Sequence, residues 1–344
     1  MNAGSVRIFA LLITTCQLRA SSPEALAEAA RGTAFAKQGS YEVAIQHYQA
    51  ALRLDPHLPG LYVNLGLAYF KTKRFPEAVA AFEEAVRADP TSFQPRALLG
   101  MSYYGSAKYA LATKHLKAAA DLQPENLELR YTLAQSYLWS EQYAQAIDEF
   151  RFLLGKNPDS AAVHVLLGEV LDAANRLPEA TAEFEAAAKG SPKQRDVHFG
   201  LGYLYWKQQR YEEACREFEA ELRNEPQHVQ ALTYLGDAEM RLKQEAAAQD
   251  HLQRAATLDP NARLAHLDLG ILLANKSESE AAARQFREAI RIDPSKPDAH
   301  YRLGRLWKSM GRNEEAKAEF EQIKTLAGQE SPAPLFRVAG VKGP

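Results

Sequence analysis

The sequence is poor in cysteine and in net charge, and each scarcity excludes a class of protein. Only two cysteines, Cys16 and Cys215, occur among 344 residues, which is too few for a disulfide framework, and neither has a partner at metal-ligand spacing. Lysine and arginine total 41 against 43 acidic residues, giving a net charge of −2. Because nucleic-acid binders need a basic surface, we expect no nucleic-acid partner.

Long apolar runs and catalytic motifs are also scarce. The sequence contains no Gly-rich phosphate loop, HExxH, CxxC or Gly-x-Ser-x-Gly, each of which would place a nucleophile, a metal or a phosphate at a defined spacing. We therefore expect no enzyme activity, no cofactor and no metal. No run approaches the roughly twenty apolar residues that span a bilayer, so no transmembrane segment is expected.

The apolar run that does occur, from Ile8 to Thr15, lies near the N-terminus behind a single Arg7. This arrangement favours a signal peptide that is cut after Ala20, and with it a periplasmic or secreted location. Two alternatives stay open: a lipoprotein cleavage box that ends at Cys16, and an uncleaved apolar helix that covers the start of the fold in a cytoplasmic protein.

Prolines recur through the chain at a constant spacing of 34 residues. The series is Pro56, Pro90, Pro124, Pro158, Pro192, Pro226, Pro260 and Pro294. A fixed period of this size indicates a repeat array. We number each repeat from 1 to 34 with this proline at position 32, so that the first repeat begins at Ala25.

Other repeat positions are as constant as the proline. Position 20 is alanine in all nine repeats, position 7 is leucine in eight, and position 8 is glycine in all but the fourth, which has Ala134. Apolar residues at positions 4, 7 and 11 share one helical face, and the small residues let a second helix approach. The proline then stops that second helix. The pattern predicts two helices per repeat.

The repeat resembles the tetratricopeptide repeat, as in Leu61–Tyr69 followed by Ala78, Phe82, Ala85 and Pro90. The resemblance covers residues 25–330 and implies an all-α, right-handed superhelical solenoid of antiparallel helix pairs with a concave inner surface. It leaves residues 1–24, the apolar N-terminal segment, and a Pro- and Gly-containing tail at 331–344. We expect this tail to fold back on the ninth repeat; a separate binding motif is the alternative.

Two kinds of residue depart from simple packing. Glu221 stands at position 27, where most other repeats have alanine, and Glu239 stands at position 11, where most other repeats have an aromatic residue. Histidine recurs at position 4 in the fifth, sixth, eighth and ninth repeats. Because packed helices lie about 8–10 Å apart, histidines one repeat apart cannot share a metal ion, so we interpret them as packing residues between helices.

Positions 2, 5, 6, 9, 12 and 13 lie on the helical face opposite the packing face, and this face is unexpectedly aromatic. Some of it packs between neighbouring first helices; we expect the rest to line a ligand groove. Its charges are acidic in repeats five to eight, including Asp196 and Asp268, and basic in the ninth. The predicted groove residues are Phe70, Tyr104, Tyr131, Trp139, Glu169, Asp172, Phe199, Tyr203, Trp206, Tyr234, Asp237, Arg302, Arg305 and Lys308.

The sequence thus predicts a non-enzymatic protein-interaction scaffold that binds an extended peptide or a partner helix in its concave groove. Aromatic and aliphatic anchors with a basic stretch between them would suit the acidic middle of this groove. The alternative is an envelope-located glycan-binding or assembly factor, in which tyrosine and tryptophan stack on sugar rings.

Overall fold

A computed structural model describes residues 22–58 and 60–326, and eighteen α-helices make up the ordered elements of these ranges. The chain divides into two compact units, Met1–Pro124 and Glu125–Pro344. The first unit contains α1 (Pro23–Lys37), α2 (Tyr41–Leu54), α3 (Leu61–Lys71), α4 (Phe75–Ala88), α5 (Phe93–Gly105) and α6 (Tyr109–Leu122).

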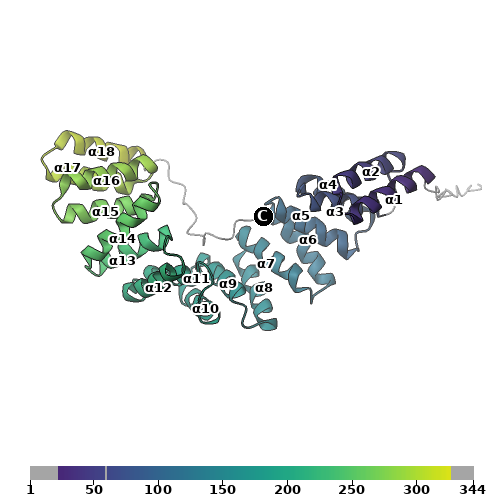
Figure 1. Cartoon of the computed structure of the whole chain (residues 1–344), viewed down its shortest axis with the longest axis horizontal. Coiled ribbons are helices and arrows are strands. Elements are labelled where there is room, and N and C mark those ends of the chain that lie inside the picture. The colour runs from purple at the N-terminus through teal and green to yellow at the C-terminus, as the bar shows by residue number, and fades with distance from the viewer. Residues whose placement is uncertain (1–21, 59, 327–344) are drawn as a thin grey trace, which may run out of the picture. The chain divides into compact units, whose positions relative to one another are not determined.

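The second unit carries the remaining helices, which follow one another along the chain in pairs (Figure 1). They are α7 (Leu127–Trp139), α8 (Tyr143–Lys156), α9 (Ala161–Ala173), α10 (Leu177–Gly190), α11 (Val197–Lys207), α12 (Tyr211–Asn224), α13 (Val229–Arg241), α14 (Glu245–Leu258), α15 (Arg263–Asn275), α16 (Ser279–Ile292), α17 (Pro297–Ser309) and α18 (Asn313–Leu326).

Each repeat forms one antiparallel helix pair, as the 34-residue period predicts. The alanine at position 20 is completely buried in eight repeats and almost completely in the ninth, at Ala316. A Cβ added at Gly202 would lie 2.8 Å from the Phe218 ring of the paired helix. Only glycine or a rearranged partner fits so close an approach, which explains the small residue at position 8.

The prolines confirm where the helices start. Pro23 and Pro297 stand in the first turn of α1 and α17, and Pro76 and Pro178 stand in the first turn of α4 and α10. A proline costs no hydrogen bond there, because the first N–H groups of a helix have no partner within it.

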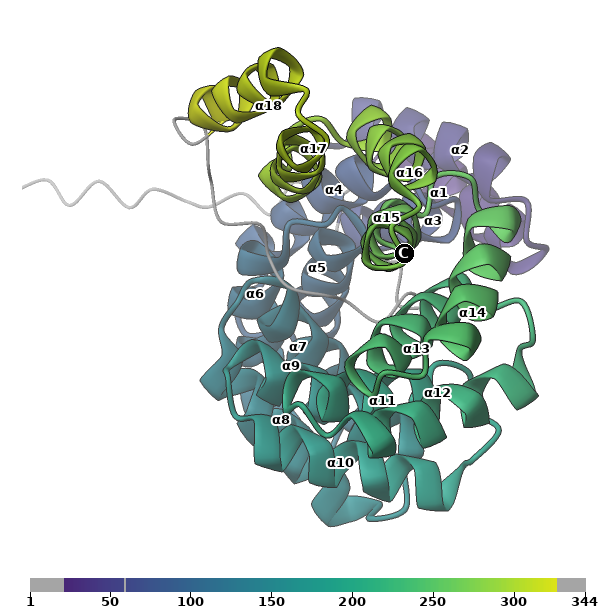
Figure 2. The same ribbon diagram turned by 90° about the vertical axis from the view of Figure 1, so that its left-hand side faces the viewer.

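First helices of consecutive repeats touch one another in addition to their own second helices. In the second unit α11 contacts α13, α13 contacts α15, and α15 contacts α17. Figure 2 shows α11, α13 and α15 on the inner side of this unit, with α12 and α14 outside them. The inner face of the second unit is therefore formed by the helices that carry the predicted groove residues.

Within the described ranges, no helix combines the length and the apolar character needed to cross a bilayer. The predicted signal segment and the predicted C-terminal tail both lie outside the described residues.

Candidate functional site

Three aromatic side chains meet where α11 and α13 face each other in the second unit. The Tyr203 and Trp206 rings stack with centroids 6.0 Å apart, and Tyr234 meets Tyr203 at 5.3 Å and Trp206 at 5.2 Å, both edge-on. Tyr203 is buried, whereas Trp206 and Tyr234 are half-buried. Burial raises the pKa of Tyr234 to about 12, so its hydroxyl stays protonated and can donate a hydrogen bond.

Acidic side chains lie on both sides of this aromatic cluster, Asp237 bound to Trp206 and Asp172 bound to Lys207. The Trp206 indole N–H donates to Asp237 over 2.5 Å, and the Arg241 guanidinium reaches the other oxygen of Asp237 at 3.4 Å. On the side of α9, the Lys207 ammonium donates to Asp172 and lies 5.7 Å from the centre of the Tyr203 ring. These hydrogen bonds fix the predicted residues Trp206, Asp237 and Asp172 in place.

Asp268 on α15 is the next acid along the inner face, and it is only 9% exposed. Burial raises its pKa well above the ordinary value, and the neighbouring Asp237 carboxylate raises it further. Removal from water disfavours the charged form of a carboxyl group, and a second negative charge nearby has the same effect. Asp268 is therefore an acid whose charge this environment poorly compensates.

Phe199 was predicted to line the groove, and this prediction is wrong. Its side chain is completely buried and packs against Phe218 at 5.8 Å, His228 at 4.9 Å and Tyr234 at 6.0 Å. Phe199 belongs to the core between α11, α12 and α13 and supports Tyr234 from behind. The helical-wheel argument failed here because position 5 points towards the next repeat.

Tyr203, also predicted to line the groove, is instead buried, whereas the remaining predicted aromatic residues are half-buried. In the second unit Tyr131 meets Phe150 edge-on at 6.5 Å, and Glu169 contributes to a raised pKa of the Tyr131 hydroxyl, of which burial is the larger cause. Trp139 is half-buried at the end of α7. The two predictions in the first unit, Phe70 and Tyr104, contact Phe75 at 5.6 Å and Tyr109 at 5.5 Å respectively.

The basic predictions lie on the surface of α17. Arg302, Arg305 and Lys308 are all exposed, and the Arg305 guanidinium lies 5.9 Å from the centre of the exposed Tyr301 ring. The second unit thus carries buried acids on α9, α13 and α15 and exposed basic side chains on α17.

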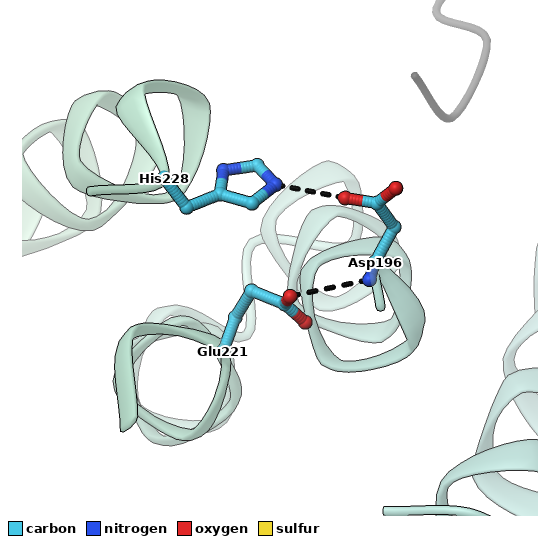
Figure 3. A group of neighbouring side chains, drawn as sticks. All are labelled: Asp196, Glu221 and His228. Atoms are coloured by element: carbon cyan, nitrogen blue, oxygen red, sulfur yellow. Dashed lines mark hydrogen bonds and ion pairs between the residues drawn. The ribbon is translucent and has the colours of Figure 1, made fainter. Parts of the chain in front are cut away.

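The sequence analysis missed a buried group of three side chains, which consists of Asp196, Glu221 and His228 (Figure 3). Glu221 on α12 is completely buried, and its two oxygens accept from the backbone N–H groups of Asp196 and Phe199, each over 3.1 Å. These N–H groups belong to the start of α11. The departure from a small residue at position 27 is therefore a side-chain cap on the neighbouring helix.

The other two members of the group complete the cap. Asp196 has a left-handed backbone with φ of 63°, which is unusual for a residue with a side chain. The His228 Nε2–H donates to Asp196 over 2.9 Å, while His228 Nδ1 accepts from the Ala231 N–H at the start of α13. Asp196, predicted as a groove acid, is instead buried in this network.

The same three side chains have the composition of a metal site, with their ligand-type atoms within 4.8 Å of one another. A metal would need a bare nitrogen on His228, yet Nδ1 is bound to a backbone donor and Nε2 carries the proton that Asp196 accepts. Glu221 is likewise engaged by two backbone donors. The chemistry of this donor set fits the capping of α11 and α13, and it does not fit an ion.

The histidines at position 4 lie between the two helices of their own repeat, as predicted. Each places Nδ1 against the residue nineteen positions later: His164 with Glu183 at 2.6 Å, His198 with Glu217 at 2.7 Å, His266 with Gln285 at 2.7 Å and His300 with Glu319 at 2.6 Å. The hydrogen bond that Glu217 accepts raises the pKa of His198. The nineteen-residue spacing of these partners could have been found in the sequence.

A cleft of about 700 Å³ opens in the first unit, on the side of the turns that join α2 to α3 and α4 to α5. Its walls include Leu58, Tyr62, Val63, Arg87 and Pro95. None of the predicted groove residues lines it.

Family models of the tetratricopeptide repeat match most of the chain. The models described as TPR repeat or tetratricopeptide repeat match residues 32–73, 59–92, 103–151, 131–195, 199–263 and 272–333. The chain belongs to the tetratricopeptide repeat family. Its class of function is accordingly that of a protein-interaction scaffold.

Solved structures share the fold of this tetratricopeptide repeat chain. The C-terminal part of a TPR repeat-containing protein from Cytophaga hutchinsonii is 15% identical over 69% of this chain and 98% of that one, with a TM-score of 0.57. The pilF protein of Pseudomonas aeruginosa is 22% identical over 60% of this chain and 94% of that one, with a TM-score of 0.53. No curated protein matches the chain.

Proposed function

We propose that this tetratricopeptide repeat chain is a non-enzymatic scaffold that binds an extended peptide or a partner helix on the inner face of its second unit. The observation that carries the proposal is the pair of half-buried rings, Trp206 and Tyr234, on first helices that face the inner side. Tryptophan and tyrosine dominate binding energy where they are partly exposed beside water-excluding neighbours.

The surroundings of Trp206 support this role. Its indole is held by the hydrogen bond to Asp237 and by the Tyr203 and Tyr234 rings. A ring that is already fixed loses little conformational entropy when a partner packs on it. Trp206 is thus pre-organised as a contact for an apolar side chain.

The charges of the second unit would orient the bound segment. Asp172, Asp237 and Asp268 lie along the inner first helices, whereas Arg302, Arg305 and Lys308 are exposed on α17. Complementary charge mainly sets register and direction. We expect the segment to place positive charge near α13 and α15 and negative charge near α17.

The proposal is tested by selecting peptides from a phage-displayed library on the full chain and measuring the affinity of the synthetic peptides by fluorescence anisotropy. Trp206→Ala should weaken binding at least about tenfold, the equivalent of 1.4 kcal/mol, with its helicity checked by circular dichroism. Arg302→Glu should weaken the binding of peptides that have an acidic end. Arg254→Glu, on the second helix α14, is the matched control.

Two results would contradict the proposal. Either no peptide is selected, or the selected peptides bind Trp206→Ala and Arg302→Glu as tightly as they bind the control. A glycan array run with the same variants covers the alternative ligand: sugars that bind in place of peptides, and that depend on Trp206, would assign the aromatic face to glycans.

We also propose that the chain is exported after removal of residues 1–20. This proposal rests on the apolar run Ile8–Thr15 and on the residues around Ala20. Intact-mass spectrometry of the protein from its native cells should show a mature chain that begins at Ser21; a chain that retains Met1 or Asn2 at its start would contradict export.

A further inference from the structure

Two buried carboxylates lie on adjoining first helices of the second unit, Asp237 on α13 and Asp268 on α15. Asp237 is 8% exposed and Asp268 is 9% exposed, and the two helices touch. The Asp237 carboxylate is close enough to disfavour the charged form of Asp268, and both carboxylates act on the Tyr234 hydroxyl. The half-buried rings of Tyr234 and Trp206 border this acidic pair.

The donors around the pair leave it only partly compensated. Asp237 accepts from Trp206 and loosely from Arg241, whose side chain is 56% exposed. Among the described residues, none donates a hydrogen bond to Asp268. Arg263 is the other cation nearby, but it forms a two-pronged ion pair with Asp298 at 2.8 and 2.9 Å. A buried carboxylate without a paired cation or donor lowers the stability of the fold. Its presence therefore indicates that a positively charged group of a binding partner pairs with it.

Elsewhere the chain shows which partner such a combination takes. Three arginines stack over an aromatic ring and pair with a glutamate three residues later: Arg312 over Trp307 at 3.7 Å with Glu315, Arg210 over Tyr205 at 4.3 Å with Glu213, and Arg74 over Tyr69 at 4.7 Å with Glu77. Each of these three clusters consists of an aromatic ring, a carboxylate and a guanidinium.

The site at Asp237 and Asp268 has the rings and the carboxylates of this arrangement without its guanidinium. Among the described side chains, no arginine stacks on Trp206 or Tyr234. We propose that Asp237 and Asp268, bordered by Trp206 and Tyr234, form the binding site for an arginine side chain of the bound partner segment. This inference rests on the proposed function, because it names one residue of the segment that the inner face would bind.

Arginine suits the site better than lysine. Its planar guanidinium carries five N–H donors and can bridge two carboxylates at once, and it stacks on aromatic rings. It is also more weakly hydrated than an ammonium group, so it loses less when it enters a buried site. The loose contact of Arg241 with Asp237 is one that an incoming arginine can replace.

The test resynthesises the peptides selected on the full chain with each arginine replaced in turn by citrulline, which keeps the shape and removes the charge. At one position the replacement should weaken binding to the wild-type chain at least about tenfold. The same replacement should change binding to the Asp237→Asn/Asp268→Asn double variant by less than about twofold, and binding to Asp268→Asn by an intermediate factor. Asp250→Asn on α14, where the side chain is 67% exposed, should behave like the wild type.

The outcomes separate this inference from the proposed function. Peptides that depend on Trp206 but contain no arginine, or that bind equally well with citrulline, would overturn the arginine site and leave the scaffold proposal standing. A citrulline effect of undiminished size in the Asp237→Asn/Asp268→Asn double variant would also overturn it, as would a peptide with lysine in place of arginine that binds as tightly. Failure to select any peptide would contradict both the arginine site and the scaffold proposal. Asp237→Asn gives a second test, and thermal melting confirms that each variant is folded.

Discussion

Two groups of buried acids, one in the sixth repeat and one in the seventh and eighth repeats, differ in what compensates their charge. Glu221 is completely buried and accepts two backbone N–H groups, while Asp196 accepts from His228. Asp268 is nearly as buried, yet it accepts no hydrogen bond from the described residues and its pKa is raised well above the usual range. Burial alone does not distinguish a structural acid from a binding acid.

The difference lies in the donors. The N-terminus of a helix offers unpaired N–H groups and a partial positive charge, so a carboxylate placed there stabilises the fold. Asp268 stands in the middle of α15, where every backbone N–H is already used by the helix. The fold gains nothing evident from this carboxylate, and a partner's cation would supply what the helix cannot.

The largest expected effect is on the structural group. Glu221→Ala leaves two buried N–H groups without acceptors and should lower the free energy of unfolding by about 3 kcal/mol. Urea unfolding followed by circular dichroism measures this change. Glu219→Ala, on the exposed side of the same helix, is the control. Equal stability of the two variants would mean that the cap contributes little and that the contrast between the two groups is false.

The next effect concerns the hydrogen bond that ties the aromatic cluster to Asp237. Trp206→Phe keeps a ring in the cluster but removes the indole N–H, and should cost about 2 kcal/mol because the buried Asp237 carboxylate loses this donor. A double-mutant cycle with Asp237→Asn isolates the bond. A coupling energy near zero would show that the ring packing, and not the bond, positions Trp206.

Removal of the uncompensated acid should have the opposite sign. Asp268→Asn keeps the shape and removes the buried charge, so at pH 7 the melting temperature should rise by about 2–4 °C, the shift that ~1 kcal/mol produces in a domain of this size. Stabilisation on loss of a functional side chain is typical of binding sites. Asp250→Asn should leave melting nearly unchanged; a destabilised Asp268→Asn would assign Asp268 to the fold.

The smallest effect is the pH dependence of that gain. The unfolded chain releases the Asp268 proton near the usual pKa of 3.8, whereas the folded chain keeps it to higher pH. The wild type should therefore lose stability relative to Asp268→Asn as the pH rises from about 4 through the raised pKa. Urea unfolding of both proteins across this range gives the difference curve. A flat difference would show that Asp268 titrates alike in both states.

Most of the fold could be predicted because the same packing residues recur at the same positions in all nine repeats. The alanine at position 20 and the small residue at position 8 each mark a close contact within a helix pair, and the proline at position 32 marks where the second helix ends. In residues 22–58 and 60–326, eighteen helices occur where these positions place them. The separation of the contacts into two units at Pro124 has no counterpart in the regular spacing and could not have been predicted from it.

The candidate site was predicted only in part. Trp206, Tyr234 and Asp237 were chosen from a helical wheel and lie together, whereas Phe199 was chosen from the same wheel and is core. A wheel describes one helix and cannot tell which side of it the next repeat covers. The cap of Glu221 was missed because its partners lie 25 and 22 residues away on another helix; the only sign was an acid at a position that is apolar in every other repeat.

The most direct test of the contrast is the titration of the Asp268 carboxyl group in the full chain. Carbon-13 NMR of aspartate-labelled protein, with Asp268→Asn to assign the signal, follows the ionisation of this one group. We expect Asp268 to titrate above its usual range in the free chain and to ionise at lower pH once an arginine-containing selected peptide is bound. An ordinary pKa in the free chain, unmoved by the peptide, would contradict the assignment of Asp268 as a binding acid.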